Sequence, residues 1–184
     1  TVMPETPSSM VPLTTQMPLF SLSDGNGNPW SKDSDKQGML IVFMCNHCPF
    51  VMHVDSLLQE LHTLCERNNI QMVGINSNDI GTHPADSPEN MVITAEKNGW
   101  TFPYLFDEDQ SVARAFHAAC TPDAFLYNDA GQLFYRGQFD DSRPSGGEPN
   151  GADVKNAISL LVEGQSPPEE QKPAIGCNIK WKAI

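Results

Sequence analysis

The sequence predicts one α/β domain built on a small layered sheet whose strands run in mixed directions. Residues 39–44 are a continuous apolar run, the pattern of a strand that is covered on both faces, and 71–76 are expected to form a second buried strand. Between them, at 49–67, apolar residues recur at three- and four-residue steps, which indicates a helix. Two strands connected through a helix run parallel. Residues 124–136 then form a hairpin around a turn at 128–131, which adds antiparallel strands.

Local start and stop signals place the other elements. Ser87 is expected to cap a helix that begins at Pro88 and ends before Gly99, and Gly164 is expected to end a last helix. The remaining expected segments are an extended arm at 1–16, a strand at 18–22 that enters a hairpin turn at 23–28, a strand at 102–106, a helix at 110–119, a polar loop at 141–151, the last helix at 153–163 and an irregular tail at 166–184. The folded domain is therefore expected at 17–165.

Composition excludes several classes of function. The 184 residues carry a formal net charge of −12, whereas nucleic-acid binding needs a basic face. No stretch is long and apolar enough to span a membrane, and no secretory leader is visible, so we expect a cytoplasmic protein. The five cysteines are an odd number, which suits a reducing compartment with reactive thiols rather than a fully paired disulfide framework. The oligomeric state is left open.

Two cysteines stand where a buried strand turns into a helix. Pro49 fits the first helical position, so Cys48 is the expected N-cap residue. A sulfur there lies near unpaired backbone N–H groups and the positive end of the helix dipole, which favour thiolate. Cys45 and Cys48 thus form a Cys-x-x-Cys motif suited to redox chemistry. The other register, with Cys45 at the N-cap, would put Pro49 inside the helix and remove a backbone donor, so we favour the first.

The order of these features resembles the thioredoxin fold. In that fold a cis-proline loop faces the cysteine at the helix N-terminus, and Thr121-Pro122 stands just before the hairpin. The opening at 20–24 resembles the redoxin branch, which holds the alkyl hydroperoxide reductase/thiol-specific antioxidant proteins and other peroxiredoxins. The Cys-Asn-His-Cys-Pro motif at 45–49, with 86–91 and 176–181, resembles one peroxiredoxin-like group within it. The resemblance spans residues 17–182. It implies a central mixed β-sheet flanked by helices, with an N-terminal β-hairpin extension and a C-terminal tail.

The resemblance also implies a thiol–disulfide oxidoreductase or peroxiredoxin-like antioxidant protein that needs no bound cofactor. Cys48 is the expected nucleophile, and the expected resolving thiol is Cys45 first and Cys120 second. Thr121 and Pro122 would hold a substrate segment by backbone pairing. His47, between the two motif cysteines, would lower a thiol pKa when protonated. The expected partners are a dithiol electron donor of thioredoxin or glutathione type and a disulfide or peroxide substrate.

The motif departs from the peroxiredoxin pattern Pro-x-x-x-Thr-x-x-Cys. In the favoured register Met44 takes the place of its proline, Cys48 that of its threonine and Val51 that of its peroxidatic cysteine. Because all three residues are lost, disulfide exchange is favoured over peroxide reduction.

Two other classes of function stay open. The first is a non-catalytic module that binds a soft metal such as copper, with Cys45, His47, Cys48 and His53 as ligands. The second is a thioredoxin-like partner-binding domain with inert thiols. Among the other candidates, Cys65 falls on an apolar helix face and reads as core, and Cys177 is either a mobile resolving thiol or a tail anchor. Arg136 and Arg143 are the candidates for holding an anion.

Overall fold

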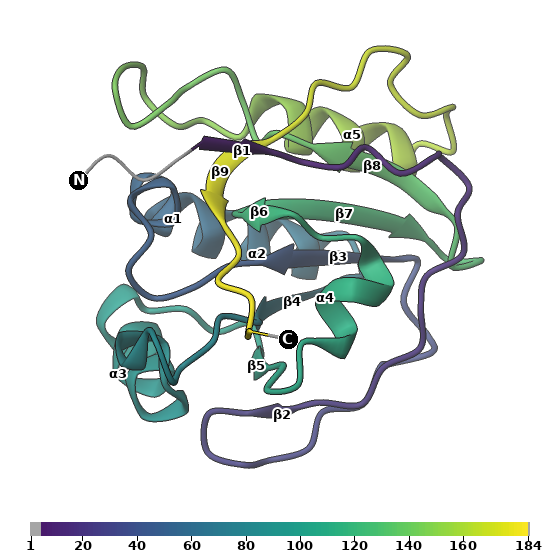
Figure 1. Ribbon diagram of the computed structural model, residues 1–184. Helices are drawn as coiled ribbons and strands as arrows, with labels where there is room; N and C mark the ends of the chain where they lie inside the picture. The colour runs from purple at the N-terminus through teal and green to yellow at the C-terminus, as the bar shows by residue number, and fades with distance from the viewer. Residues whose placement is uncertain (1–4, 184) are drawn as a thin grey trace.

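A mixed sheet of six strands forms the centre of the computed structural model, which describes residues 5–183 (Figure 1). The strand order is β2-β5-β4-β3-β7-β8. The bounds are β2 (Ser23–Asp24), β3 (Gly38–Phe43), β4 (Ile70–Asn76), β5 (Tyr104–Phe106), β7 (Asp123–Asn128) and β8 (Leu133–Gly137). Strand β3 runs parallel to β4 and antiparallel to β7. The predicted mixed sheet, its parallel β-α-β unit and its hairpin are confirmed.

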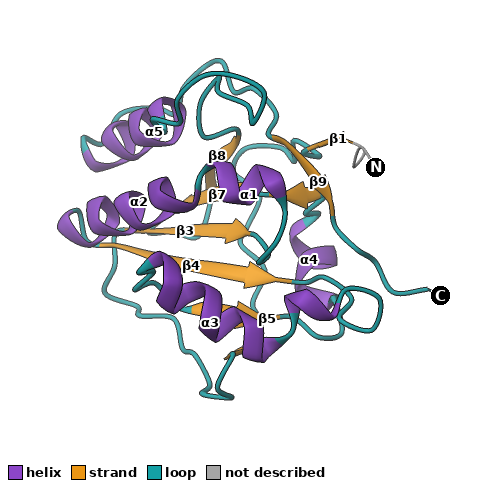
Figure 2. Cartoon of the chain, turned by 90° about the vertical axis from the view of Figure 1, so that its left-hand side faces the viewer, coloured by secondary structure: helices purple, strands orange, loops and turns teal. Residues whose placement is uncertain are grey.

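Helices cover both faces of this sheet (Figure 2). They are α1 (Pro49–His53), α2 (Asp55–Arg67), α3 (Pro88–Asn98), α4 (Ser111–Phe116) and α5 (Ala152–Val162), with a 3-10 turn η1 at Pro84–Asp86. One hydrophobic cluster joins the sheet to α2, α3 and α5, and a second joins it to α4. Along β3, Leu40 and Val42 belong to the first cluster, whereas Ile41 and Phe43 belong to the second. This alternation explains why the strand is apolar at every position.

A second, smaller sheet joins the two ends of the chain. Its order is β1 (Glu5–Pro7), β9 (Ile175–Asn178) and β6 (Cys120–Thr121), all antiparallel. Figure 1 shows the purple N-terminal strand and the yellow C-terminal strand side by side. The expectation of an irregular tail is therefore wrong at 175–178. This strand is stabilised by pairing with β1 and β6, which lie far away in the sequence. A local sequence pattern cannot predict such pairing.

Two local expectations also need correction. The expected strand at 18–22 is absent, and the strand is instead Ser23–Asp24. The hairpin turn after it is confirmed, because the Asp24 carboxylate accepts the backbone N–H groups of Asn26 and Asn28, each at 2.9 Å. The single expected helix at 49–67 is broken at Val54, whose backbone leaves the helical region at φ −110° and ψ 13°.

The signals around the third helix are confirmed. The Ser87 hydroxyl accepts the N–H of Asn90 at 3.3 Å, and Gly99 ends the helix at a positive φ of 67°. Within residues 5–183, no helix is long and apolar enough to cross a bilayer.

Candidate redox site

Cys48 occupies the helix N-cap, as the favoured register predicts. Strand β3 ends at Phe43 and α1 begins at Pro49, and Cys48 between them is extended, at φ −65° and ψ 127°. Its carbonyl oxygen accepts the N–H groups of Val51 at 3.0 Å and Met52 at 2.9 Å, which starts the helix. Cys48 therefore stands at the N-terminal end of α1, where the helix dipole is positive.

The cis-proline loop faces this cysteine. The Thr121–Pro122 bond is cis, as predicted, and lies between β6 and β7. The sulfur of Cys48 is 3.4 Å from the carbonyl oxygen of Thr121. The two features that the resemblance placed together are thus in contact.

Cys48 is bonded to Cys177 on β9. The two cysteines are 129 residues apart in sequence, with Cα atoms 6.3 Å apart, and their exposed fractions are 3% and 1%. Cys177 is also the antiparallel pairing partner of Thr121. The sequence favours Cys45 and then Cys120 as the partner of Cys48, and it leaves Cys177 open as either a mobile resolving thiol or a tail anchor. In this structure the tail supplies the partner instead, because β9 carries its cysteine across the cis-proline loop.

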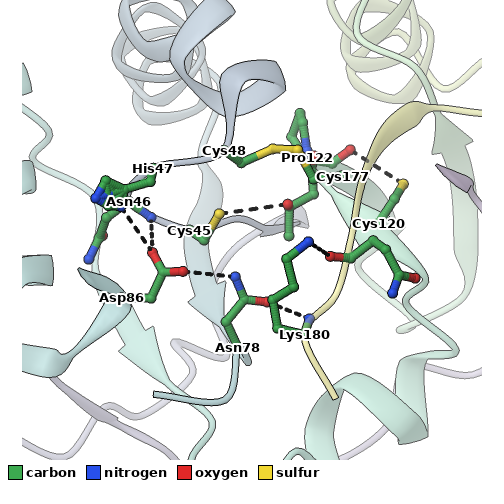
Figure 3. Close-up of a disulfide and its surroundings, with 12 residues drawn as sticks. Cys45, Asn46, His47, Cys48, Asn78, Asp86, Cys120, Pro122, Cys177 and Lys180 are labelled. Atoms are coloured by element: carbon green, nitrogen blue, oxygen red, sulfur yellow. Dashed lines mark hydrogen bonds and ion pairs between the residues drawn. A yellow bond between two sulfur atoms is a disulfide. The ribbon is translucent and has the colours of Figure 1, made fainter. Parts of the chain in front are cut away.

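The two expected resolving thiols are free and buried. The sulfur of Cys45 lies 3.7 Å from the hydroxyl of Thr121, and Figure 3 shows it directed there rather than at the disulfide. Burial, with a smaller effect of the Asp86 charge, raises the pKa of Cys45 to about 11. Burial and then the charge of Asp123 raise the pKa of Cys120. Both thiols are therefore held in their protonated, less reactive form.

The two candidate histidines contact groups other than the disulfide. His47 is half-exposed, and its Nδ1 is 4.0 Å from a carboxylate oxygen of Asp86, on the far side of the loop (Figure 3). His53 meets the hydroxyl of Ser142 at 2.8 Å. No group of three metal-ligating side chains comes together among the residues described here. The soft-metal interpretation therefore gains no support from the arrangement.

Both candidate arginines are engaged by the protein's own oxygens. The Nε of Arg136 donates to the carbonyl of Val11 at 2.7 Å. The guanidinium of Arg143 donates to the carbonyl of Ser142 at 2.8 Å and to the side-chain oxygen of Gln138 at 2.9 Å. Neither guanidinium is directed at Cys48 by these contacts.

The sequence does not predict a buried polar network that lies beside the disulfide. Asp86 accepts the backbone N–H of Asn46, next to the motif, and also contacts the amide of Asn78. These residues come from three separate segments of the chain. The segments at 86–91 and 176–181 stood out only through the family resemblance.

The fold and the site define a thioredoxin-like protein, with a helix-N-terminal cysteine opposite a cis-proline loop. Residues 13–136 match the AhpC/TSA family model, and the chain belongs to that family. No curated protein matches the chain.

Solved structures share the fold of this chain. A conserved protein from Geobacillus kaustophilus is 46% identical, with a TM-score of 0.95 and full coverage of both chains. A protein from Sinorhizobium meliloti 1021 is 39% identical, with a TM-score of 0.95, over 97% of this chain and 100% of its own. A secreted disulfide oxidoreductase from Mycobacterium tuberculosis shares the fold at 15% identity and a TM-score of 0.59, over 77% of this chain and 95% of its own.

Alkylation of the reduced protein near neutral pH is expected to label Cys48 before Cys65 and Cys177. Cys48 lies at a helix start, whereas burial and then the nearby Glu66 charge raise the pKa of Cys65 to about 12. Limiting reagent followed by peptide mass spectrometry gives the order, and Cys48→Ser should remove the first label. If Cys65 reacts first, the helix-start argument is wrong.

Proposed function

We propose that the protein is a thiol–disulfide oxidoreductase in which Cys48 is the nucleophile and Cys177 is the resolving thiol. One observation carries this proposal: the N-cap sulfur is bonded to a tail cysteine that pairs with the residue before the cis-proline. A thiolate at a helix N-terminus is the usual attacking group in such exchange, and a second thiol in reach releases the product.

The proposed cycle balances two electrons. The thiolate of Cys48 attacks a substrate disulfide, forms a mixed disulfide and releases one substrate thiol. The thiolate of Cys177 then attacks the sulfur of Cys48, forms the bond seen in the structure and releases the second thiol. The substrate gains two electrons and two protons, and the protein loses them. A cytoplasmic dithiol donor of thioredoxin or glutathione type returns the protein to its reduced form, without a bound cofactor.

The tail occupies the edge that we expected to hold a substrate. The backbone of Thr121 pairs with Cys177, and the other edge of β9 is covered by β1. We therefore place substrate pairing at Thr121 and Pro122 in a transient form of the reduced protein, in which β9 has separated from Thr121 while the tail stays anchored at Lys180. A small disulfide needs less movement of the tail than an extended peptide.

Disulfide exchange is the preferred chemistry over peroxide reduction. The peroxiredoxin proline and peroxidatic cysteine positions hold the buried side chains of Met44 and Val51. Arg136 and Arg143 already bind protein oxygens. A leaving peroxide oxygen would lack the aimed donors that stabilise its charge, whereas attack on a disulfide depends mainly on the thiolate and on access to the sulfur.

A side-by-side assay tests this preference. With one dithiol donor, reduction of a model disulfide should exceed hydrogen peroxide consumption by at least about a hundredfold, the effect of losing one preorganised donor. Rates are compared as kcat/KM for wild type and for Cys48→Ser, which controls for reaction of the donor itself. Fast peroxide consumption that requires Cys48 would restore a peroxidase function and overturn the preference.

A further inference from the structure

Two buried side chains connect the segment of Cys48 with the segment of Cys177. One carboxylate oxygen of Asp86 accepts the backbone N–H of Asn46 at 2.8 Å, and the other accepts the amide Nδ2 of Asn78 at 3.0 Å. The Oδ1 of Asn78 accepts the backbone N–H of Lys180 at 2.9 Å. Figure 3 shows this path below the disulfide. Asn46 stands two residues before Cys48, and Lys180 three residues after Cys177.

Only one arrangement of donors and acceptors along this path gives every polar group a hydrogen-bond partner. A backbone N–H only donates, an ionised carboxylate only accepts, and an amide does both at different atoms. Asp86 must therefore face the Nδ2 of Asn78, which leaves the Oδ1 for the tail. Both residues are only 4% exposed, so water is a poor substitute for a lost partner.

The contacts of this path do not depend on the sulfur–sulfur bond. The carbonyl oxygen of Lys180 also accepts the N–H of Asp79 at 2.8 Å and the side-chain amide of Gln110 at 2.9 Å. These bonds hold the tail beyond Cys177 to the segments that follow β4 and β5. None of these contacts involves either sulfur atom, so we expect them in the reduced protein as well, when Cys48 and Cys177 are separate thiols.

We propose that Asp86 and Asn78 are positioning residues that hold the Cys177 segment against the Cys48 loop in the reduced protein. They thereby set the effective concentration of the resolving thiol. This inference rests on the exchange between Cys48 and Cys177 proposed above. Closure of the bond is balanced by glutathione disulfide: two protein thiols become one disulfide, and one glutathione disulfide becomes two glutathione molecules.

Three variants separate this role from general packing. In Asp86→Asn, an amide donor faces either the Asn78 amide or the Asn46 N–H, so one donor pair clashes. In Asn78→Asp, two carboxylates face each other. The double variant Asp86→Asn/Asn78→Asp restores a complete path, because the new amide accepts from Asn46 and donates to the new carboxylate, which accepts from Lys180. Asn156→Asp, at an exposed site on α5, is the matched control.

The measurement is the equilibrium between the Cys48–Cys177 disulfide and glutathione at pH 8, read by mass spectrometry after acid quenching. Each single variant should lower the equilibrium constant for closure by about tenfold, the effect of one lost buried hydrogen bond. The double variant should return to within about threefold of wild type, and Asn156→Asp should match wild type. Single variants within twofold of wild type, or a double variant no better than the worse single, would overturn the proposal.

Two parallel readouts keep the conclusions apart. A purely structural role would lower the melting temperature of the oxidised and reduced forms equally and leave the closure equilibrium unchanged, which contradicts the proposal. Turnover of a model disulfide is measured on the same samples. Shifted and rescued closure without turnover supports the positioning role and refutes the proposed enzyme. Turnover together with an unchanged closure equilibrium supports the proposed enzyme and refutes the positioning role.

Discussion

Replacing Cys48 with serine is expected to lower dithiol-dependent reduction of a model disulfide by at least about a thousandfold, because the attacking group is lost. Cys177→Ser is expected to behave differently. Cys48 should still attack the substrate. The thiol of Cys177, which is the partner of Cys48 in the disulfide, is then missing and cannot release the product. The mixed disulfide on Cys48 should therefore accumulate, and intact-mass spectrometry should detect the added substrate group.

The other buried thiols provide the controls. Cys65→Ser removes a buried thiol that has no part in the proposed exchange. Any loss of activity in this variant would therefore measure damage to the fold. Cys45→Ser and Cys120→Ser test the partners that the sequence alone suggested. If Cys177→Ser keeps full turnover while Cys45→Ser traps the mixed disulfide, then Cys45 is the resolving thiol and the bond to Cys177 has another role.

The features that the sequence predicts correctly are those with local causes. The apolar run around Ile41 and the proline at Pro49 fix a buried strand and a helix start, whatever packs against them. Cys48 therefore reaches the N-cap by rules that act within a few residues. The hairpin before Gly137 and the cap at Ser87 follow for the same reason.

The partner of Cys48 depends on contacts of another kind. The sequence favours Cys45 because it lies three residues from Cys48, whereas Cys177 lies 129 residues away along the chain. The position of β9, the strand that carries Cys177, is set by its pairing with β6 and β1. No periodicity in the sequence of the tail predicts that pairing. The sequence does not predict the Asp86–Asn78 hydrogen bond for a similar reason. Single polar residues in loops form no recognisable pattern until folding brings the loops together.

Asp123 makes the stability of the protein sensitive to pH. This carboxyl follows the cis-proline directly and is fully buried. One of its oxygens accepts the N–H of Ala119 at 3.2 Å, and the other has no hydrogen-bond partner within residues 5–183. Burial, only partly offset by these backbone donors, raises its pKa from 3.8 to about 7. The folded protein therefore holds this proton more tightly than the unfolded chain does.

The unfolding free energy should consequently fall as the pH rises from about 4 to about 7, and then level off. Between these values the folded state binds more protons than the unfolded state, which gives the negative slope. A pKa rise of this size corresponds to at most about 4 kcal/mol. Asp123→Asn, which stays neutral, should remove this slope and be more stable than wild type at pH 8 by about 2–4 kcal/mol. Near pH 4 the two proteins should be closely similar.

Urea unfolding of the oxidised protein from pH 4.5 to pH 8 measures this effect directly. Asp129→Asn, at an exposed carboxyl in the hairpin turn, is the matched control and should run parallel to wild type. The difference between the two asparagine variants isolates the buried carboxyl from the general charge of the protein. Parallel curves for wild type and Asp123→Asn would show that Asp123 is ionised in the folded state without penalty. In that case the orphaned oxygen must have a partner in solution, because a buried unpaired carboxylate without one is costly.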